Sequence, residues 1–394
     1  MSSDLSRIGL NWKAKEFDKT NRVAQIDRRT NWNKLCERAS NLRGGLHCQP
    51  LNHTTNGFYN LVRLLEFADG TLWVARINLS RSVESLAILE SEIHVMQLLK
   101  ARSCLPVPEI FAYEVNENND VCVPFILMEF IPGNTAMNAA GGYDEHRGRI
   151  LAQHRPTFYR SVAQCHLQMT ALRFPKIGTI VRAPNGQYDV GPLPHLGGPF
   201  YTATQFFEAW AKHAKFPRDE NDILRGMRNG PVEKVVGAIR EFPSQILALA
   251  SRLSEQDHGP FPLCHGDFIH SNMIVNDHFD VTAIIDWEGS RTLPLELVAF
   301  PGFLNILSAQ FGSSDRYDEE GLPLDEEERQ RWNDRKGYVE MVREFEGTDN
   351  VLSTCLSNKK GLALGYLISS YENGKLGFYD EVMREHFGEE SEGI

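Results

Sequence analysis

The pattern of hydrophobic positions predicts strands in the first third of the chain and helices in the rest. Short β-prone runs between polar turns predict strands in 43–80 and 111–130, with a hairpin turn at Asp69-Gly70. Apolar residues three and four positions apart predict helices at 31–42, 82–100, 157–172, 204–216, 233–253 (broken at Pro243), 332–346 and 355–386. Residues 174–200 and 313–330 are predicted to be loops, and the polar residues 1–30 are predicted to be peripheral. This order of elements predicts an α+β protein.

A second hairpin is predicted around residue 279. Two short runs of β-prone residues, 273–275 and 281–285, flank a polar turn. Asn272 precedes the first run and Asp286 follows the second, so a regular hairpin would place them opposite one another, about 5 Å apart at Cβ. An amide oxygen and a carboxylate at that separation can share one Mg²⁺ ion, which is usually completed by substrate phosphates.

A third polar residue belongs to the same pattern. Asp267 lies five positions before Asn272, in a loop that follows an apolar run, where its carboxylate could accept the proton of an attacking hydroxyl. The order D-x-x-x-x-N followed by a metal-binding aspartate is the arrangement that protein kinases use for phosphoryl transfer. Two solvated aspartates and an asparagine turn are the alternative. The preceding His265-Gly266 and the placing of Asp286-Trp287-Glu288 after the hairpin favour the catalytic interpretation.

The motif H-G-D-x-x-x-x-N followed by I-D-W-E, at 265–272 and 285–288, resembles the signature of the aminoglycoside phosphotransferase and choline kinase superfamily, especially its fungal members. These proteins are relatives of the protein kinases. The resemblance covers about residues 40–390 and is dense over 261–302. It implies a two-lobed protein kinase-like fold. Residues 1–40 would form a peripheral segment and helix, 41–132 a small, mainly β nucleotide-binding lobe, and 133–394 a larger, mainly helical lobe for catalysis and acceptor binding.

The resemblance also implies roles for single residues. Asp267 would be the catalytic base, Asn272 and Asp286 would bind Mg²⁺, and His265 would support the catalytic loop. Glu288 would assist the metal indirectly.

The phosphate-binding cation of the resembled family has a counterpart in Arg76. Residues 73–77 resemble the kinase strand V-A-I-K, with arginine in place of lysine. Arginine can bind phosphate in a bidentate manner but has a different shape, so the phosphate geometry is open. Glu92 falls within the apolar stripe of the predicted helix 82–100, where a carboxylate needs a partner. We therefore predict an ion pair between Glu92 and Arg76; the alternatives are an exposed arginine and a glutamate at the rim.

Two further segments are expected to contact the nucleotide. Gly57 and Asn60 belong to a turn between predicted strands, which in the resembled family lies over the ATP phosphates; an ordinary turn is the alternative. Residues 124–131 resemble the hinge between the lobes. There, backbone groups near Glu129 and Ile131 would bind adenine and Met128 would border the pocket, unless the segment is an ordinary strand end. ATP is the expected co-substrate, with GTP left open.

Composition and charge limit the cellular location and the kinds of partner that the protein can have. No apolar run approaches the ~18 residues of a membrane span, and the first residues lack the apolar core of a signal peptide. The seven cysteines are scattered without a C-x-x-C motif, which favours reduced thiols in a cytoplasmic protein. A net charge of −11 makes nucleic acid an unfavourable partner. Residues 261–394 carry 26 acidic and 11 basic side chains, which favours a cationic acceptor or simply a solvated surface.

These observations predict a magnesium-dependent phosphotransferase that moves the γ-phosphoryl group of ATP to a hydroxyl of a small molecule. The segment after Asp286 carries no A-P-E motif, which argues against a protein substrate. Three alternatives stay open: a kinase-like protein that binds nucleotide without transfer, adenylyl transfer on the same fold, and a sensor or scaffold that binds no nucleotide. Aminoglycosides, choline-like amines, sugars and secondary metabolites are all compatible acceptors, and the oligomeric state is open.

Overall fold

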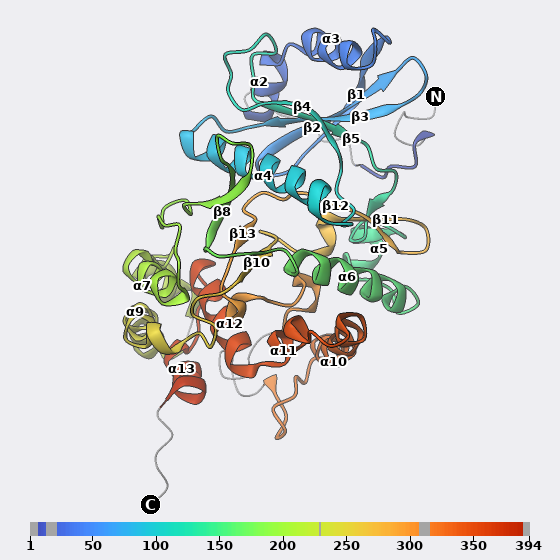
Figure 1. Ribbon diagram of the computed structural model, residues 1–394. Coiled ribbons are helices and arrows are strands. Elements are labelled where there is room, and N and C mark those ends of the chain that lie inside the picture. The colour runs from blue at the N-terminus through green and yellow to red at the C-terminus, as the bar shows by residue number, and fades with distance from the viewer. Residues whose placement is uncertain (1–6, 13–21, 228–229, 307–315, 389–394) are drawn as a thin grey trace, which may run out of the picture. The chain divides into compact units, whose positions relative to one another are not determined.

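The computed structural model describes residues 7–12, 22–227, 230–306 and 316–388 (Figure 1). The chain divides into two compact units, each built from segments that are distant in sequence. The first unit comprises Met1–Val162, Ile180–Tyr188 and His265–Ser290; the second comprises Ala163–Thr179, Asp189–Cys264 and Arg291–Ile394. The hairpin between Asn272 and Asp286 therefore belongs to the unit that contains the N-terminal sheet. The lobe boundary expected at residue 132 lies inside the first unit and remains a prediction.

The centre of the first unit is an antiparallel five-stranded sheet. Its strands are β1 (Cys48–Asn56), β2 (Asn60–Phe67), β3 (Leu72–Asn78), β4 (Ile110–Glu114) and β5 (Phe125–Glu129). They are arranged in the order β1-β2-β3-β5-β4. Arg76 lies on the central strand, opposite Val62 of β2 and Ile126 of β5. Neighbours on both sides hold the backbone of this residue in place, so the sheet sets the direction of its side chain.

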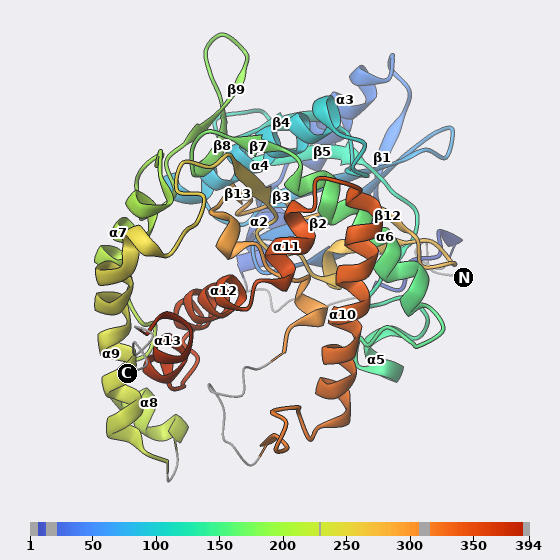
Figure 2. The same ribbon diagram turned by 60° about the horizontal axis from the view of Figure 1, so that its bottom comes forward.

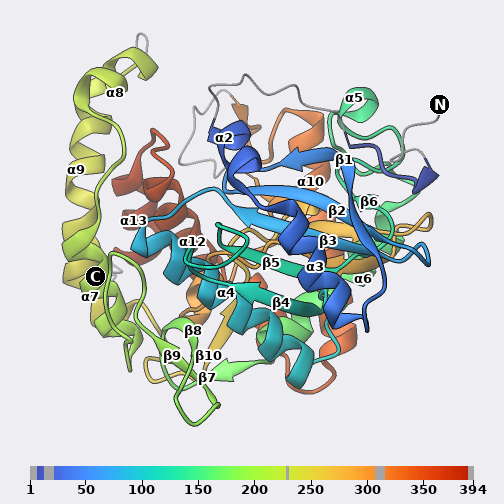
Figure 3. The ribbon, with the colours of Figure 1, turned by 90° about the horizontal axis from the view of Figure 1, so that it is seen from above.

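Helices cover the two faces of this sheet (Figure 1). The unit contains α2 (Arg22–Arg29), α3 (Trp32–Leu42), α4 (Val83–Arg102) and α5 (Gly142–His146). Seen from above, α3 lies over the strands (Figure 3). The side chains of Leu35 and Ala39 from α3 pack with Ala75 and Ile77 of β3 in one buried cluster. Helix α4 lies on the opposite face and starts at Ser82, whose hydroxyl accepts a hydrogen bond from the Ser85 N–H.

Strand β3 shows why one face of the sheet is apolar and the other is a candidate site. Trp73, Ala75 and Ile77 are buried in one cluster with α2 and α3, while Val74 and Arg76 point to the opposite side and line a pocket. Successive side chains of a strand alternate between faces. The sequence W-V-A-R-I therefore puts three residues into the core and a cation into the pocket.

A smaller sheet carries the predicted hairpin. It consists of β6 (Asn134–Thr135), β11 (Met273–Val275) and β12 (Val281–Ile284), in the order β12-β11-β6. Helix α6 (Arg155–Thr170) begins beside it. The Ser161 hydroxyl accepts a hydrogen bond from the Val281 N–H at 3.0 Å, and the His154 ring stacks on Phe279 with 4.0 Å between the ring centroids. The hairpin is thus fixed to a helix as well as to a neighbouring strand.

The second unit is mainly helical (Figure 2). Its helices are α7 (Ala203–His213), α8 (Glu220–Met227), α9 (Val232–Leu249), α10 (Glu326–Glu346), α11 (Val351–Ser357), α12 (Lys359–Glu372) and α13 (Tyr379–Phe387). Short strands form a second sheet, β7-β10-β13-β8-β9, from β7 (Arg173–Phe174), β8 (Gly178–Arg182), β9 (Tyr188–Gly191), β10 (Phe261–Cys264) and β13 (Arg291–Thr292). Trp210, Phe242, Tyr371 and Tyr379 form the aromatic centre of the helical core, with ring centroids 4.9–5.8 Å apart.

The predicted α+β class is confirmed, with strands concentrated in the N-terminal part and helices in the C-terminal part. Three local predictions were wrong. Helix α9 continues through Pro243, where burial of Phe242 and Ile246 on both sides outweighs the lost backbone hydrogen bond. The Gly/Pro-rich stretch 174–200 contains β8 and β9. The acidic run expected in a loop opens α10, because Asp325 caps it by accepting the Glu328 N–H and carboxylates favour a helix N-terminus. Residues 313–315 of that predicted loop lie outside the described residues.

Two expectations from composition can be compared with the structure. All seven cysteines are free thiols in the structure. Among the described helices, none is both long and apolar enough to cross a membrane.

A buried histidine in the second unit should make stability fall in acid. His166 of α6 lies against Tyr338 of α10, with 3.2 Å between Nδ1 and the hydroxyl oxygen, and burial lowers the pKa of His166 to about 3. Below about pH 6.5 this histidine binds a proton in the unfolded chain but not in the folded chain, so stability present at pH 7 is lost as the pH falls. Between pH 7 and pH 5 this one group should lower the free energy of unfolding by roughly 2 kcal/mol.

Urea unfolding of the wild type and of His166→Gln at the two pH values measures this difference. The variant should lose less stability on acidification than the wild type does. His258→Gln, at an exposed histidine of the same unit, serves as the control and should keep the wild-type loss. Equal losses in all three proteins would contradict the prediction.

Candidate active site

The hairpin brings Asn272 and Asp286 to one end of β11 and β12, as predicted, but with a shifted register. Met273 pairs with Ile284, and the Ile285 N–H donates to the Asn272 carbonyl at 2.9 Å. Asn272 therefore faces Ile285, one position before the residue expected from a regular hairpin. Next to the turn Val275 pairs with Val281, and an irregularity between Ile274 and Val275 adds one residue to β12. Without this residue Asn272 would face Ile284, so the irregularity brings Asp286 one position closer to Asn272.

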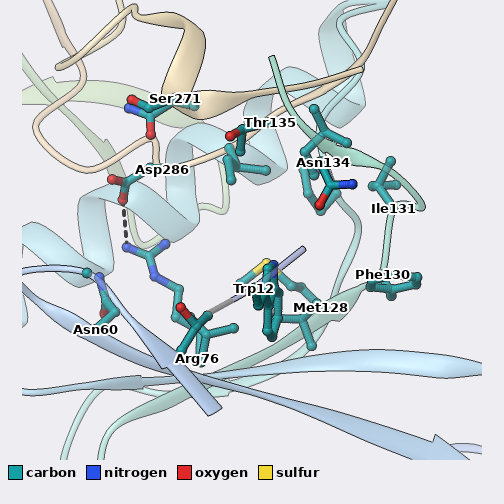
Figure 4. A pocket seen from close by; sticks show the side chains of 18 of the residues that line it. Trp12, Asn60, Arg76, Met128, Phe130, Ile131, Asn134, Thr135, Ser271 and Asp286 are labelled. Carbon is teal, nitrogen blue, oxygen red and sulfur yellow. Dashed lines mark hydrogen bonds and ion pairs between the residues drawn. The ribbon is translucent and has the colours of Figure 1, made fainter. Parts of the chain in front are cut away.

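Asp286 itself has an unusual backbone. Its φ of +63° places it in the left-handed region, which few residues other than glycine adopt. This conformation ends strand β12 and turns the carboxylate toward the pocket, where Figure 4 shows it facing Arg76. Such conformations cost about 1–3 kcal/mol and are found mostly at functional sites.

The catalytic loop is held by a buried, neutral histidine. His265 Nδ1 accepts the Asp267 N–H at 2.9 Å, and Nε2 lies 3.1 Å from the Ile285 carbonyl, so one ring links the loop to the end of β12. Burial lowers the pKa of His265 to about 4, which suits one nitrogen accepting and the other donating. The residue between them, Gly266, must be glycine, because a Cβ atom there would come within 2.2 Å of the Glu288 carbonyl oxygen.

Asp267 and Asn272 are in direct contact. The Asn272 amide nitrogen donates to the Asp267 carbonyl at 3.0 Å and approaches its carboxylate at 3.3 Å. This contact fixes the amide so that the Asn272 oxygen faces away from Asp267. Burial, with a smaller contribution from Asp286, raises the pKa of Asp267. The carboxylate is therefore oriented and more basic than one in water.

Arg76 is the centre of a buried ionic cluster. Its guanidinium is hydrogen-bonded to Glu92 of α4, and Nη2 lies 3.0 Å from Asp286 Oδ1 and 3.6 Å from Glu288 Oε2. The predicted ion pair between Arg76 and Glu92 is thus present, with Glu92 only 1% exposed. With its amide oxygen turned to the guanidinium, Asn60 accepts from Arg76 Nε at 3.1 Å and from Nη2 at 2.7 Å.

The charges of this cluster are unbalanced. One guanidinium faces the carboxylates of Glu92, Asp286 and Glu288. Burial, reinforced by Glu92, raises the pKa of Glu288 to about 7, and burial raises the pKa of Glu92 against the opposing effect of Arg76. For Arg76, the attraction of Glu92 and Asp286 outweighs burial and raises the pKa, so it stays charged. An excess of negative charge favours the binding of a cation next to Asp286.

These groups open into one pocket of about 540 Å³ (Figure 4). Asp267, Ser271, Asn272, Asp286 and Arg76 line its polar end. The rest of the wall is mainly apolar: Leu10, Trp12, Val62, Val74, Met96, Pro108, Met128, Phe130, Ile131, Ile274 and Ile285. Apolar walls with a few convergent polar groups are typical of small-molecule sites.

Nine of the twelve residues singled out from the sequence line this pocket: Gly57, Asn60, Arg76, Met128, Glu129, Ile131, Asp267, Asn272 and Asp286. The other three act on lining residues: His265 contacts Asp267, and Glu92 and Glu288 contact Arg76. Gly133, shortly after the segment compared with a hinge, occupies a position where only glycine fits. Its φ is +120°, and a Cβ atom there would come within 2.4 Å of the Val275 carbonyl oxygen.

The sequence profile of the phosphotransferase enzyme family matches residues 54–295, which include every residue of the ionic cluster and the catalytic loop. The chain belongs to the phosphotransferase enzyme family. The match begins in β1 and ends shortly after β13. The family membership implied by the H-G-D-x-x-x-x-N and I-D-W-E motifs is therefore confirmed.

Relatives of this phosphotransferase family member are distant. It is 24% identical over 222 residues to the clavilactone A biosynthesis cluster protein Y of Ampulloclitocybe clavipes, over 55% of this chain and 53% of the relative. It is 33% identical over 89 residues to a subtelomeric hrmA-associated cluster protein of Aspergillus fumigatus, over 23% of this chain and 18% of the relative. The chain thus spans about half of the first relative and less than a fifth of the second.

Among solved structures, it is similar to a thermostable mutant of the aminoglycoside phosphotransferase APH(4)-Ia in ternary complex with AMP-PNP and hygromycin B. The TM-score is 0.46 at 14% identity, with 90% of this chain and 99% of that chain covered.

Several pocket residues of this phosphotransferase family member were not singled out in the sequence. Val62 and Val74 could have been found from strand alternation, because their neighbours in sequence face the core. Ser271 lies inside the D-x-x-x-x-N motif. Leu10 and Trp12 could not have been found, and the prediction that residues 1–30 are peripheral does not hold for residues 7–12. Their contacts are made by a segment with no recognisable periodicity.

The polar end offers oxygen ligands suited to Mg²⁺. Within the described residues, no three His, Cys, Asp or Glu side chains converge to form a complete metal cage. Asn272 and Asp286 nevertheless provide an amide oxygen and a carboxylate at the same end of the pocket. Mg²⁺ is usually held by one or two carboxylates together with substrate phosphates, so an incomplete protein ligand set fits this metal.

Proposed function

We propose that the protein transfers the γ-phosphoryl group of ATP to a hydroxyl of a small molecule. The observation that supports this most is that Asp267, Asn272, Asp286 and Arg76 share one end of a single pocket whose remaining wall is mainly apolar. An apolar slot suits a purine base, and the charged end suits phosphates and a metal. Backbone groups near Glu129 and Ile131 are proposed to bind the base, while Gly57 and Asn60 lie along the phosphates.

In this proposal the protein mainly positions the substrates and neutralises the negative charge of the phosphates. Asn272 and Asp286 hold Mg²⁺, which, when bound, neutralises charge on the phosphate oxygens. Arg76 lies beside Asp286 and supplies positive charge at the same end, while Glu92 fixes its direction from behind. Positioning and electrostatic stabilisation of this kind account for most of the catalysis in phosphoryl transfer.

Asp267 is proposed to accept the proton of the attacking hydroxyl. Its carboxylate lines the pocket, and Asn272 and His265 fix it from two sides. The raised pKa caused by its burial strengthens it as a base. His265 is not among the pocket-lining residues and both of its ring nitrogens are hydrogen-bonded to backbone groups, so we assign it a positioning role and not a chemical one.

The acceptor is proposed to be small and cationic. The excess of carboxylates in residues 261–394 would attract a positively charged amine toward this part of the chain. Choline-like amines and aminoglycosides combine such a charge with a free hydroxyl and form the first set of acceptors to screen. ADP release from Mg-ATP in the presence of each compound is the measurement.

Nucleotide binding is tested first, by thermal unfolding. Mg-ATP at ~100 times its Kd should stabilise the wild type by about 2.7 kcal/mol, a shift of a few degrees. Asp286→Asn should reduce this shift, because it removes a metal ligand. Asp277→Asn, at an exposed aspartate in the turn of the same hairpin, should keep it. If Mg-ATP and Mg-GTP both leave the wild type unchanged at millimolar concentrations, the proposed function is wrong.

A second candidate is a nucleotide-binding protein without transfer. It is favoured by one observation: Asp286 Oδ1 is engaged by Arg76 Nη2 at 3.0 Å. A metal at Asp286 must share that oxygen, use the other one or displace the arginine. Nucleotide-dependent stabilisation without ADP release from any acceptor in the screen would support this candidate.

A further inference from the structure

The N-terminal segment 7–12 is tied to the pocket by polar contacts. Arg7 forms an ion pair with Glu66 of β2. The Asn11 N–H donates to Asn134 Oδ1 at 3.0 Å, and Asn134 Nδ2 donates to the Gly9 carbonyl at 2.9 Å, so the two segments are joined in both directions. The segment is therefore fixed by contacts to two elements that are distant in sequence, β2 through Glu66 and β6 through Asn134.

Apolar contacts hold the same segment from the other side. Leu10 is 7% exposed and forms a small buried cluster with Leu51 of β1 and Leu64 of β2. Ile8 and Trp12 pack against this cluster together with Leu72, Val74 and Phe130. The position of the Trp12 indole is therefore set by Leu10, which precedes it by two residues, and by the sheet beneath.

Trp12 lies at the apolar end of the pocket. Its indole lies beside Met128 and on the same side as Phe130, away from the polar end with Asp286 (Figure 4). A cavity of about 540 Å³ remains with the indole in place, within the roughly 300–1,000 Å³ of small-molecule sites. The side chain thus forms a wall of the pocket and leaves room for a ligand beside it.

We propose that Trp12 is a nucleotide-binding residue whose indole packs against the base of the bound nucleotide. This inference rests on the proposed function, which places the base at the apolar end. Aromatic rings favour stacked or edge-to-face contact, and stacking on a base is tolerant of its identity. Trp12 therefore adds affinity for purine nucleotides in general and does not choose between ATP and GTP.

The affinity of Trp12 variants for Mg-ATP tests this by calorimetry. Trp12→Ala should weaken binding by roughly 10- to 100-fold, to a similar extent for Mg-ATP and Mg-GTP. Trp12→Phe keeps a ring and should bind within a few-fold of the wild type. Because both substitutions remove the indole, a binding loss in Trp12→Ala alone reports stacking and not a general disturbance of the segment.

Fluorescence gives a second readout. Mg-ATP should change the indole emission of the wild type, which has six tryptophans, and this change should be absent in Trp12→Phe although the variant still binds. Trp332→Phe, which removes an indole from α10 in the second unit, should keep the nucleotide-dependent change.

The possible outcomes distinguish failure of the proposed function from failure of the inference about Trp12. Wild type that binds no nucleotide overturns the proposed function and this inference with it. Wild type and Trp12→Ala that bind equally well overturn the inference and leave the proposed function standing. Tighter binding by Trp12→Ala also overturns it, because the indole would then obstruct the site.

Discussion

Replacing Asp267 with asparagine should lower turnover by roughly 10²- to 10⁴-fold, the usual contribution of a general base. The amide has nearly the same size and can still accept the contact from Asn272, but it cannot take up the proton of the attacking hydroxyl. The measurement is ADP release from Mg-ATP, with the acceptor identified in the screen or, before that, with water as acceptor. The Mg-ATP-dependent thermal shift should remain, because Asp267 is not among the proposed metal ligands.

The pairing of activity with binding makes this test specific. A variant that loses both turnover and the thermal shift would show that Asp267 supports the nucleotide site as a whole. Asp267→Asn with wild-type turnover would remove the residue from its proposed role. His265→Gln should have a smaller effect than Asp267→Asn, since it alters the support of the loop and leaves the carboxylate in place.

The sequence predicted the parts of the site that local patterns determine. The hairpin with Asn272 and Asp286 at one end follows from two β-prone runs around a polar turn. The ion pair of Arg76 and Glu92 follows from a carboxylate inside an apolar helical stripe and a cation on a neighbouring strand. Glu92 interrupts an otherwise regular apolar pattern, and a carboxylate in such a place requires a partner.

The parts that could not be predicted depend on long-range contacts or on a single backbone angle. Trp12 reaches the pocket because Asn11 and Asn134, more than a hundred residues apart, bond to each other. The bulge in β12 brings Asp286 to within one position of Asn272, and the positive φ of Asp286 redirects its side chain. Neither feature leaves a periodic signal. The engagement of Asp286 by Arg76 likewise arises only when both are placed in three dimensions.

Replacing Arg76 with methionine should cost about 3–5 kcal/mol of unfolding free energy, because it leaves buried Glu92 without its counter-charge. Asp286 and Glu288 lose the same partner, although both are more exposed than Glu92. Urea unfolding at pH 7 measures the loss. Lys34→Met, which breaks the exposed ion pair with Glu37 on α3, is the control and should leave stability nearly unchanged.

The double variant Arg76→Met/Glu92→Leu separates stability from function. Replacing both partners of a buried ion pair with apolar residues of similar size is often neutral or stabilising, so this protein should regain most of the stability that the single variant loses. It should still show little Mg-ATP-dependent thermal shift, because the charge proposed to face the phosphates is gone. A double variant that is stable and keeps the wild-type shift would show that Arg76 is a structural residue and not a phosphate-binding one.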